Sequence, residues 1–271
     1  MPVHFCILLP VRRFLIMKLL VYFGVFLISS VIVLSQDLQW TRMVGTSGAD
    51  AGQGVAVDSD GSVYVTGYAQ GSLHDQNSAG NQDIIFMKYS SNGTRVWTRL
   101  VGTAGNDQGY GVAVDNAGYV YVTGFASASI HGQMYSGGGG DVVLMKYSTN
   151  GTRIWTKMAG STTADVGTAV AVDTAGGFVY VAGNTDGSLH GQTNGGDNDI
   201  FLMQFSINGT RIWTKLVGGA GGDLAHSVAL DNAGFVYVAG EAGESVDGEP
   251  FAGVLDLSLI HISEPTRQRQ P

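Results

Sequence analysis

Aspartate and histidine residues recur at fixed intervals along this chain, and they are its clearest candidates for chemistry. The aspartates are Asp50, Asp107, Asp165 and Asp223; the histidines are His74, His131 and His190, with Asp247 in the fourth histidine position. Carboxylates and imidazoles that meet on one face of a protein could bind a metal ion or a polar sugar. A residue that returns in every unit of a repeat also has a structural use, because aspartate accepts backbone N–H bonds in tight turns. We expect the structural role for the aspartates and keep the histidines as ligand-face candidates.

Residues 58–61, Asp-Ser-Asp-Gly, resemble the start of a calcium-binding loop. The equivalent segments at Asp115 and Asp231 lose the second carboxylate, and no glutamate follows at the spacing of a calcium loop. A turn is therefore expected here, with Ca²⁺ as the alternative cofactor and no other cofactor indicated.

Three Asn-Gly-Thr triplets begin at Asn92, Asn150 and Asn208. Each satisfies the acceptor rule for N-glycosylation. Asn-Gly is also the preferred two-residue hairpin turn, in which both residues adopt positive φ. The sequence predicts a turn at all three sites, with glycosylation as an additional use in a secreted protein.

Four tryptophans, Trp40, Trp97, Trp155 and Trp213, are 57, 58 and 58 residues apart, and the surrounding sequence repeats with them. Such a period indicates one supersecondary unit copied in tandem. In the second unit, residues 111–115 and 119–124 read as a hairpin, and residues 141–147 and 153–158 as a second hairpin joined by Asn-Gly. Four antiparallel strands per unit are typical of a propeller blade. The fold class is thus all-β: a β-propeller of roughly 58-residue blades.

The phase of the repeat predicts an incomplete arc. Residues 38–45 read as an outer strand without the rest of its blade, three complete blades follow, and a fourth begins near residue 218. Since propellers commonly close by pairing an N-terminal outer strand with the last blade, we expect the natural protein to hold more units.

The motifs resemble the SBBP repeat family, named for seven-bladed β-propellers. The resemblance rests on Gly-Val-Ala-Val-Asp, Val-Tyr-Val-Thr-Gly, Met-Lys-Tyr-Ser-x-Asn-Gly-Thr and Trp-Thr, and it covers residues 37–256. It implies the propeller fold but no single activity.

The two ends of the chain differ from the repeats. Residues 1–35 place Arg12, Arg13 and Lys18 before an apolar run, which is the plan of a cleaved signal peptide, with an uncleaved anchor as the alternative. Cleavage would fall before Gln36. Residues 257–271 resemble the in-frame translation of a Nextera-type sequencing adapter, and a divergent natural tail is the alternative. We therefore expect signal peptide, truncated propeller at residues 36–256, and an artefactual tail.

Composition limits the function. The chain carries 22 acidic and 14 basic residues, a net charge of −8, which argues against nucleic acid as a partner. Its one cysteine, Cys6, lies in the segment expected to be removed, so the propeller has no disulfide. The leading hypothesis is a secreted or cell-surface module, without catalysis, that binds an extracellular protein or a glycan and touches a membrane only through an uncleaved anchor. The alternatives are an extracellular hydrolase, lyase or quinoprotein-like enzyme with its active site in further blades, and a purely structural surface module.

Overall fold

The computed structural model describes residues 15–22, 25–32, 38–173, 177–246, 248–253 and 256–262. These residues form strands and loops only, and the chain divides into two units, residues 1–42 and 43–271. In the first unit, β1 (Leu15–Tyr22) pairs antiparallel with β2 (Val25–Ile32). The described residues contain no helix long and apolar enough to cross a membrane. The interpretation of residues 1–35 as a signal peptide or anchor stays a prediction, and the expected cleavage point lies outside the described residues.

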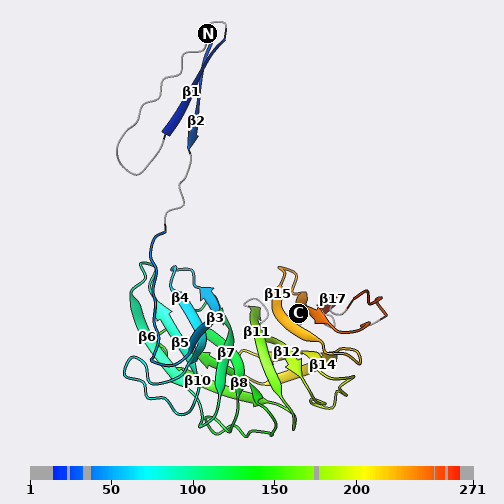
Figure 1. Cartoon of the computed structure of the whole chain (residues 1–271). Coiled ribbons are helices and arrows are strands. Elements are labelled where there is room, and N and C mark those ends of the chain that lie inside the picture. Colours follow the sequence, from blue (N-terminus) through cyan, green and yellow to red (C-terminus); the bar gives the residue numbers. More distant parts are fainter. Residues whose placement is uncertain are drawn as a thin grey trace, which may run out of the picture. The chain divides into compact units, whose positions relative to one another are not determined.

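The second unit is a succession of four antiparallel meanders, which confirms the propeller-blade architecture (Figure 1). Blade 1 contains β3 (Asp50–Val57), β4 (Val63–Ala69), β5 (Asp83–Tyr89) and β6 (Arg95–Val101). Blade 2 contains β7 (Asp107–Val114), β8 (Val120–Ala126), β9 (Asp141–Tyr147) and β10 (Arg153–Ala159). Blade 3 contains β11 (Asp165–Asp173), β12 (Phe178–Thr185), β13 (Asp199–Ser206) and β14 (Arg211–Val217). Blade 4 contains β15 (Leu224–Leu230), β16 (Val236–Ala242) and β17 (Asp256–Ile262).

The hydrophobic core lies between successive blades. One cluster joins Tyr64, Phe86 and Trp97 of blade 1 to Val120 and Met145 of blade 2. Two further clusters repeat this arrangement between blades 2 and 3 and between blades 3 and 4. Because the middle strands are covered by a blade on each side, every residue of β9 is buried, whereas β17 in the last blade alternates exposed with half-buried residues.

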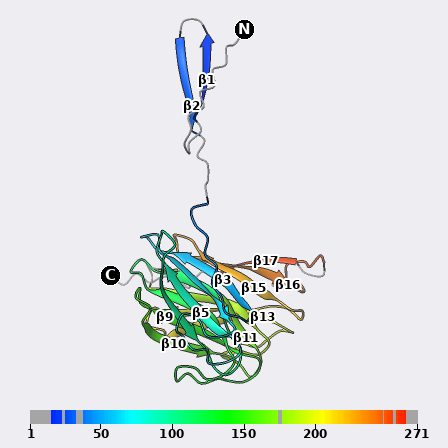
Figure 2. The ribbon, with the colours of Figure 1, turned by 60° about the vertical axis from the view of Figure 1, so that its left-hand side comes forward.

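The innermost strands β3, β7, β11 and β15 contact one another in turn. Figure 2 shows β3, β11 and β15 from a second side. Their small residues permit this approach: a Cβ at Gly54 would overlap the carbonyl oxygen of Tyr110 in the next blade. Each inner strand also carries one bulge, at Gln53, Tyr110, Thr168 and His226. A bulge turns its extra residue out of the regular pleat.

One local prediction was wrong. Residues 38–45, predicted as an outer strand, form no strand. In the other blades that strand hydrogen-bonds to the third strand of its own blade, and the described residues include none for this segment. Residues 257–262, which are set apart from the repeats by sequence, form β17 together with Asp256 and pair with β16. Their alternating Leu-Ser-Leu-Ile-His-Ile sequence suits a strand with one face covered. The assignment of the tail to an adapter stays a prediction.

Candidate binding face

The four recurrent aspartates fasten the start of each inner strand to the end of its neighbour. Asp50 accepts hydrogen bonds from the backbone N–H of Thr46 at 2.6 Å and of Gln70 at 3.1 Å. Asp107 repeats this with the N–H groups of Thr103 and Ser127, and Asp223 with those of Gly219 and Gly243. Asp165 bonds the N–H of Ser161 and the hydroxyl of Thr185. Burial is the main cause that raises the pKa of Asp107 and of Asp165.

The three recurrent histidines are turned toward the outer strand of their own blade, not toward the aspartates. Each has a positive φ, between 49° and 51°, and its Nδ1 lies 2.9 Å from a threonine hydroxyl. The pairs are His74 with Thr98, His131 with Thr156, and His190 with Thr214. Burial lowers the pKa of each imidazole, and the nearby guanidinium of Arg95, Arg153 or Arg211 lowers it further. Asp247, the fourth candidate, lies outside the described residues.

The predicted ring of Asp and His ligands is therefore not assembled. In the described part of the chain, no three His, Cys, Asp or Glu side chains come together as a set that could hold a metal ion. The calcium-like segment is a turn closed on itself: Asp58 accepts the N–H groups of Asp60 and Ser62 and the hydroxyl of Tyr64. Lys88 Nζ lies 3.7 Å from the same carboxylate and supplies the positive charge that a cation would bring.

The Asn-Gly-Thr triplets form the turns between third and fourth strands, with a different geometry from the one predicted. Only the glycines adopt positive φ, 80° at Gly93, 78° at Gly151 and 82° at Gly209. Asn92 keeps a negative φ and its Oδ1 accepts the N–H of Thr94 at 3.1 Å, and the register shifts by one residue beyond the turn. A glycine with positive φ in this position is typical of the three-residue hairpin with a glycine bulge. The register shift is a second, separate bulge at Val96. Asn92, Asn150 and Asn208 are exposed, and their glycosylation stays a prediction.

The residues that differ between blades gather at the bulges. We define the variable row as the four bulged residues together with the four residues that lie one position before the end of the second strand. It comprises Gln53, Tyr110, Thr168 and His226, with Tyr68, Phe125, Asn184 and Glu241. All eight lie at the end of the sheets where inner strands begin, and all are exposed or half-buried. Side chains that perform no common task in the blade are free to differ, so this row is the candidate functional site.

In blade 2 the row is aromatic, and amide side chains border it. The rings of Tyr110 and Phe125 stack with centroids 6.3 Å apart and 28° between planes. The Tyr110 hydroxyl donates to Gln108 Oε1 at 2.6 Å, and Gln108 Nε2 donates to Gln82. Burial raises the pKa of Tyr110, and Tyr68 of blade 1 raises it further.

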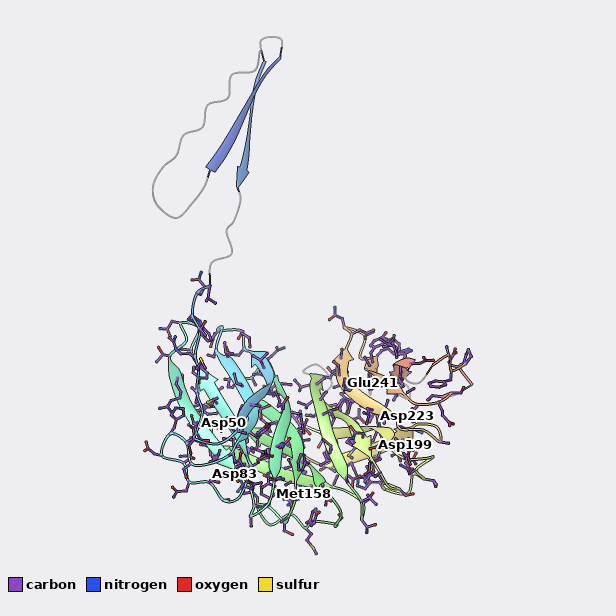
Figure 3. The ribbon with its side chains drawn as sticks, in the orientation of Figure 1. Asp50, Asp83, Met158, Asp199, Asp223 and Glu241 are labelled. Atoms are coloured by element: carbon purple, nitrogen blue, oxygen red, sulfur yellow. The ribbon has the colours of Figure 1, made fainter. Side chains whose placement is uncertain are left out.

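In blade 4 the row carries ionisable groups instead. His226 Nε2 lies 2.9 Å from Glu241 Oε1, with 55 % and 41 % of the two side chains exposed. Figure 3 shows Glu241 on the last blade. Blade 3 offers Thr168, whose hydroxyl donates to the Ala225 carbonyl at 2.7 Å, and Asn184.

Sequence reasoning missed the variable row because it gave weight to residues that recur. The signal was nevertheless present: aligned by their tryptophans, the repeats change residue type at the bulged column, while the two flanking columns hold only Gly, Ala or Ser. The bulge itself could not be foreseen, since it depends on the pairing of β3 with β4.

Comparison with known proteins agrees with the observed blades. The SBBP family, described as a beta-propeller repeat, matches residues 39–74, 96–128, 154–190 and 212–245. Regulatory protein FlaEY of Caulobacter vibrioides is 26 % identical over 229 residues, 79 % of this chain and 24 % of that protein. An uncharacterized WD repeat-containing protein, L264, of Acanthamoeba polyphaga mimivirus is 26 % identical over 195 residues, 67 % of this chain and 12 % of that protein.

Among solved structures, a protein of unknown function from Bacteroides caccae has a TM-score of 0.41 and 11 % identity, with 81 % of this chain and 59 % of that chain covered. The chain thus spans less than a quarter of the length of the two curated relatives. With four family matches that together cover half of its residues, each of them containing the first two strands of one of the four blades, this chain belongs to the SBBP beta-propeller repeat family.

Proposed function

We propose that this chain is a non-catalytic binding module whose partner docks on the variable row. The observation that carries the proposal is that the recurrent residues and the variable residues of the repeat have different contacts. Recurrent Asp, His, Tyr and Trp side chains are engaged in bonds within and between the blades, whereas the exposed variable row supplies tyrosines, amides and one ion pair. Tyrosine is enriched at protein interfaces, where it offers a large apolar surface and a polar hydroxyl.

A protein partner fits this row better than a repetitive glycan. A regular polysaccharide would meet equivalent residues in each blade, but the row changes from aromatic in blades 1 and 2 to polar in blade 3 and ionisable in blade 4. Such an asymmetric surface suits one asymmetric partner, which gains specificity from matched charges and hydrogen bonds. A glycan remains the second ligand class.

We place this activity outside the cytosol, on the strength of the basic and then apolar composition of residues 1–35. FlaEY carries the name of a regulatory protein, and a scaffold that binds other proteins is compatible with that name.

An enzymatic role is the competing proposal, and one observation favours it: His226 and Glu241 form a hydrogen-bonded pair of the kind that exchanges protons in general acid–base catalysis. Both side chains of the pair are exposed to solvent, and among the described residues no nucleophile is hydrogen-bonded to them. We therefore rank this role second.

The two proposals separate in one set of assays. Purified chain is incubated with an extracellular protein array and a glycan array, and with general esterase, glycosidase and lyase substrates. We expect saturable binding to a protein, lost on Tyr110→Ala, and no turnover. Turnover abolished by Glu241→Gln, together with no binding on either array, would establish the enzyme instead.

A further inference from the structure

At every blade junction, the aspartate that begins a third strand faces the aspartate that begins the next inner strand. The pairs are Asp83 with Asp107, Asp141 with Asp165, and Asp199 with Asp223. A backbone hydrogen bond brings them together: the N–H of Asp107 donates to the carbonyl of Gln82 at 2.8 Å. The same bond recurs at the other two junctions, and Figure 3 shows Asp199 and Asp223 next to each other.

The absence of a side chain at a neighbouring glycine leaves room for both carboxylates of a pair. A Cβ at Gly102 would overlap Asp83 Oδ1 and lie only 2.9 Å from Asp107 Oδ2. At the third junction, a Cβ at Gly218 would overlap Asp199 Oδ1 and lie 2.7 Å from Asp223 Oδ2. Gly160 stands in the same relation to Asp141. At the first and third junctions the two carboxylate oxygens therefore approach the same position beside the glycine.

One oxygen of each pair has no hydrogen-bond donor. In the third-strand aspartates, Oδ2 accepts a loop N–H, from Ala79 at 2.9 Å in the first blade. Oδ1 is buried in all three, and within the described residues it has no hydrogen-bond partner. These side chains are 0 %, 0 % and 2 % exposed at Asp83, Asp141 and Asp199. A buried charged oxygen without a donor is costly, and the cost grows when a second carboxylate faces it.

No positive charge offsets the pairs. Among the described residues, no Lys, Arg or His side chain forms an ion pair with any of the six aspartates. The other titratable groups near them add negative charge or none: Asp186 faces Asp165, and the phenol of Tyr135 lies near Asp141 and Asp165.

We propose that the two aspartates at each junction share one proton, so that the orphan Oδ1 is a hydroxyl that donates to the facing carboxylate of the next blade. Each junction then holds a single negative charge and gains a hydrogen bond between blades. The proton is taken from water as the chain folds and is returned as the pH rises. A metal ion fits less well, because each site offers only two carboxylates and the glycine Cα occupies the space beside them.

The consequence is a junction that tightens as the pH falls. Burial, and then the facing carboxylate, raise the pKa of Asp141 and of Asp199 above the ordinary 3.8. A raised pKa in the folded state means that the folded chain binds more protons than the unfolded chain between 3.8 and that higher value. Stability is therefore lost as the pH increases through this window. The histidines have lowered pKa values, so their contribution to stability changes with pH in the opposite direction. The contribution of one aspartate pair is therefore obtained as the difference in stability between a variant and the wild type.

Asp141→Asn tests the proposal on the whole chain. The carboxamide mimics the protonated acid: its oxygen accepts the N–H of Ser136 while its Nδ2 donates to Asp165. We expect the thermal midpoint at pH 8 to rise by about 2–4 °C over wild type and the gain to shrink toward pH 4.5. Asp60→Asn, in an exposed turn, removes the same charge and serves as the matched control.

Two results would overturn the proposal. One is a lower midpoint of Asp141→Asn at pH 8. The other is a rise of the wild-type midpoint with Ca²⁺ that the variant lacks, which would make the pair a cation site. Infrared spectroscopy provides a readout that does not depend on the variant's stability: wild type at neutral pH should show the carbonyl stretch of a protonated carboxyl, and absence of that band contradicts a shared proton.

Discussion

The indole Nε1 of Trp97 donates a hydrogen bond of 3.1 Å to the carbonyl oxygen of Thr149, in the Asn-Gly-Thr turn of the next blade. Trp155 repeats the contact with Ile207 at 3.2 Å. The turn glycine is required here, because a Cβ at Gly151 would lie 2.9 Å from the Trp97 ring. The recurrent tryptophan and the recurrent turn are separate features in the sequence. In the structure they form one contact that joins neighbouring blades.

Trp97→Phe should remove this bond and part of the ring contact with Phe86, whose centroid lies 4.8 Å away. We expect the free energy of unfolding to fall by about 1–2 kcal/mol, measured by urea denaturation. Trp213→Phe is the matched control, since in the described residues the Trp213 indole makes no comparable bond. An equal decrease in the free energy of unfolding for the two variants would contradict a stabilising contact between Trp97 and the next blade.

Gly102→Ala should destabilise the junction between blades 1 and 2. The new methyl group would overlap Asp83 Oδ1, and the displaced carboxylate has no other place in the buried site. The expected loss in the free energy of unfolding is about 1–3 kcal/mol, the range of overpacked cores. Gly222→Ala, where a Cβ has no neighbour within 4 Å, should leave the unfolding midpoint unchanged. A neutral Gly102→Ala would show that the junction is looser than described.

His190 should remain neutral well below the usual titration range of histidine. Burial is the larger cause and Arg211 the smaller one, and together they lower its pKa from 6.5 to about 4. The unfolded chain therefore binds more protons between these values, and stability contributed by this residue is lost as the pH falls through that window. NMR titration of the imidazole carbons checks this directly. A midpoint near 6.5 in the folded chain would contradict the part-buried His190–Thr214 contact.

Much of the fold could be predicted from the sequence, because the same turn and strand patterns recur in each blade. The strands of residues 111–115 and 141–147, the propeller class and the family all followed from recurring turns and apolar runs. The strand predicted at residues 38–45 is absent, because strand formation depends on a partner strand that the local sequence does not reveal. The strand at residues 257–262 could not be predicted from the repeat pattern, because an alternating segment outside the repeats can pair with a free sheet edge of suitable register.

The candidate site could be predicted less well. Recurrence drew attention to His131 and Asp107, which serve their blades through Thr156 and Ser127. The pairing of Tyr110 with Phe125, and of His226 with Glu241, depends on bulges that move one residue of each inner strand out of the pleat. Such displacements arise from strand pairing in three dimensions and leave only a variable column in the sequence.

The central claim is that recurrent residues hold the blades together whereas the variable row binds the partner. Its most direct test measures, for each variant, both the thermal midpoint and the affinity for the partner identified on the arrays. Tyr68→Ala and His226→Ala should weaken binding at least tenfold, about 1.4 kcal/mol, and leave the midpoint within about 1 °C of wild type. Ile212→Thr, on the exposed outer edge of β14, is the control for both readouts. Full affinity in both variable-row variants, or binding loss only in variants that also unfold, would contradict the account.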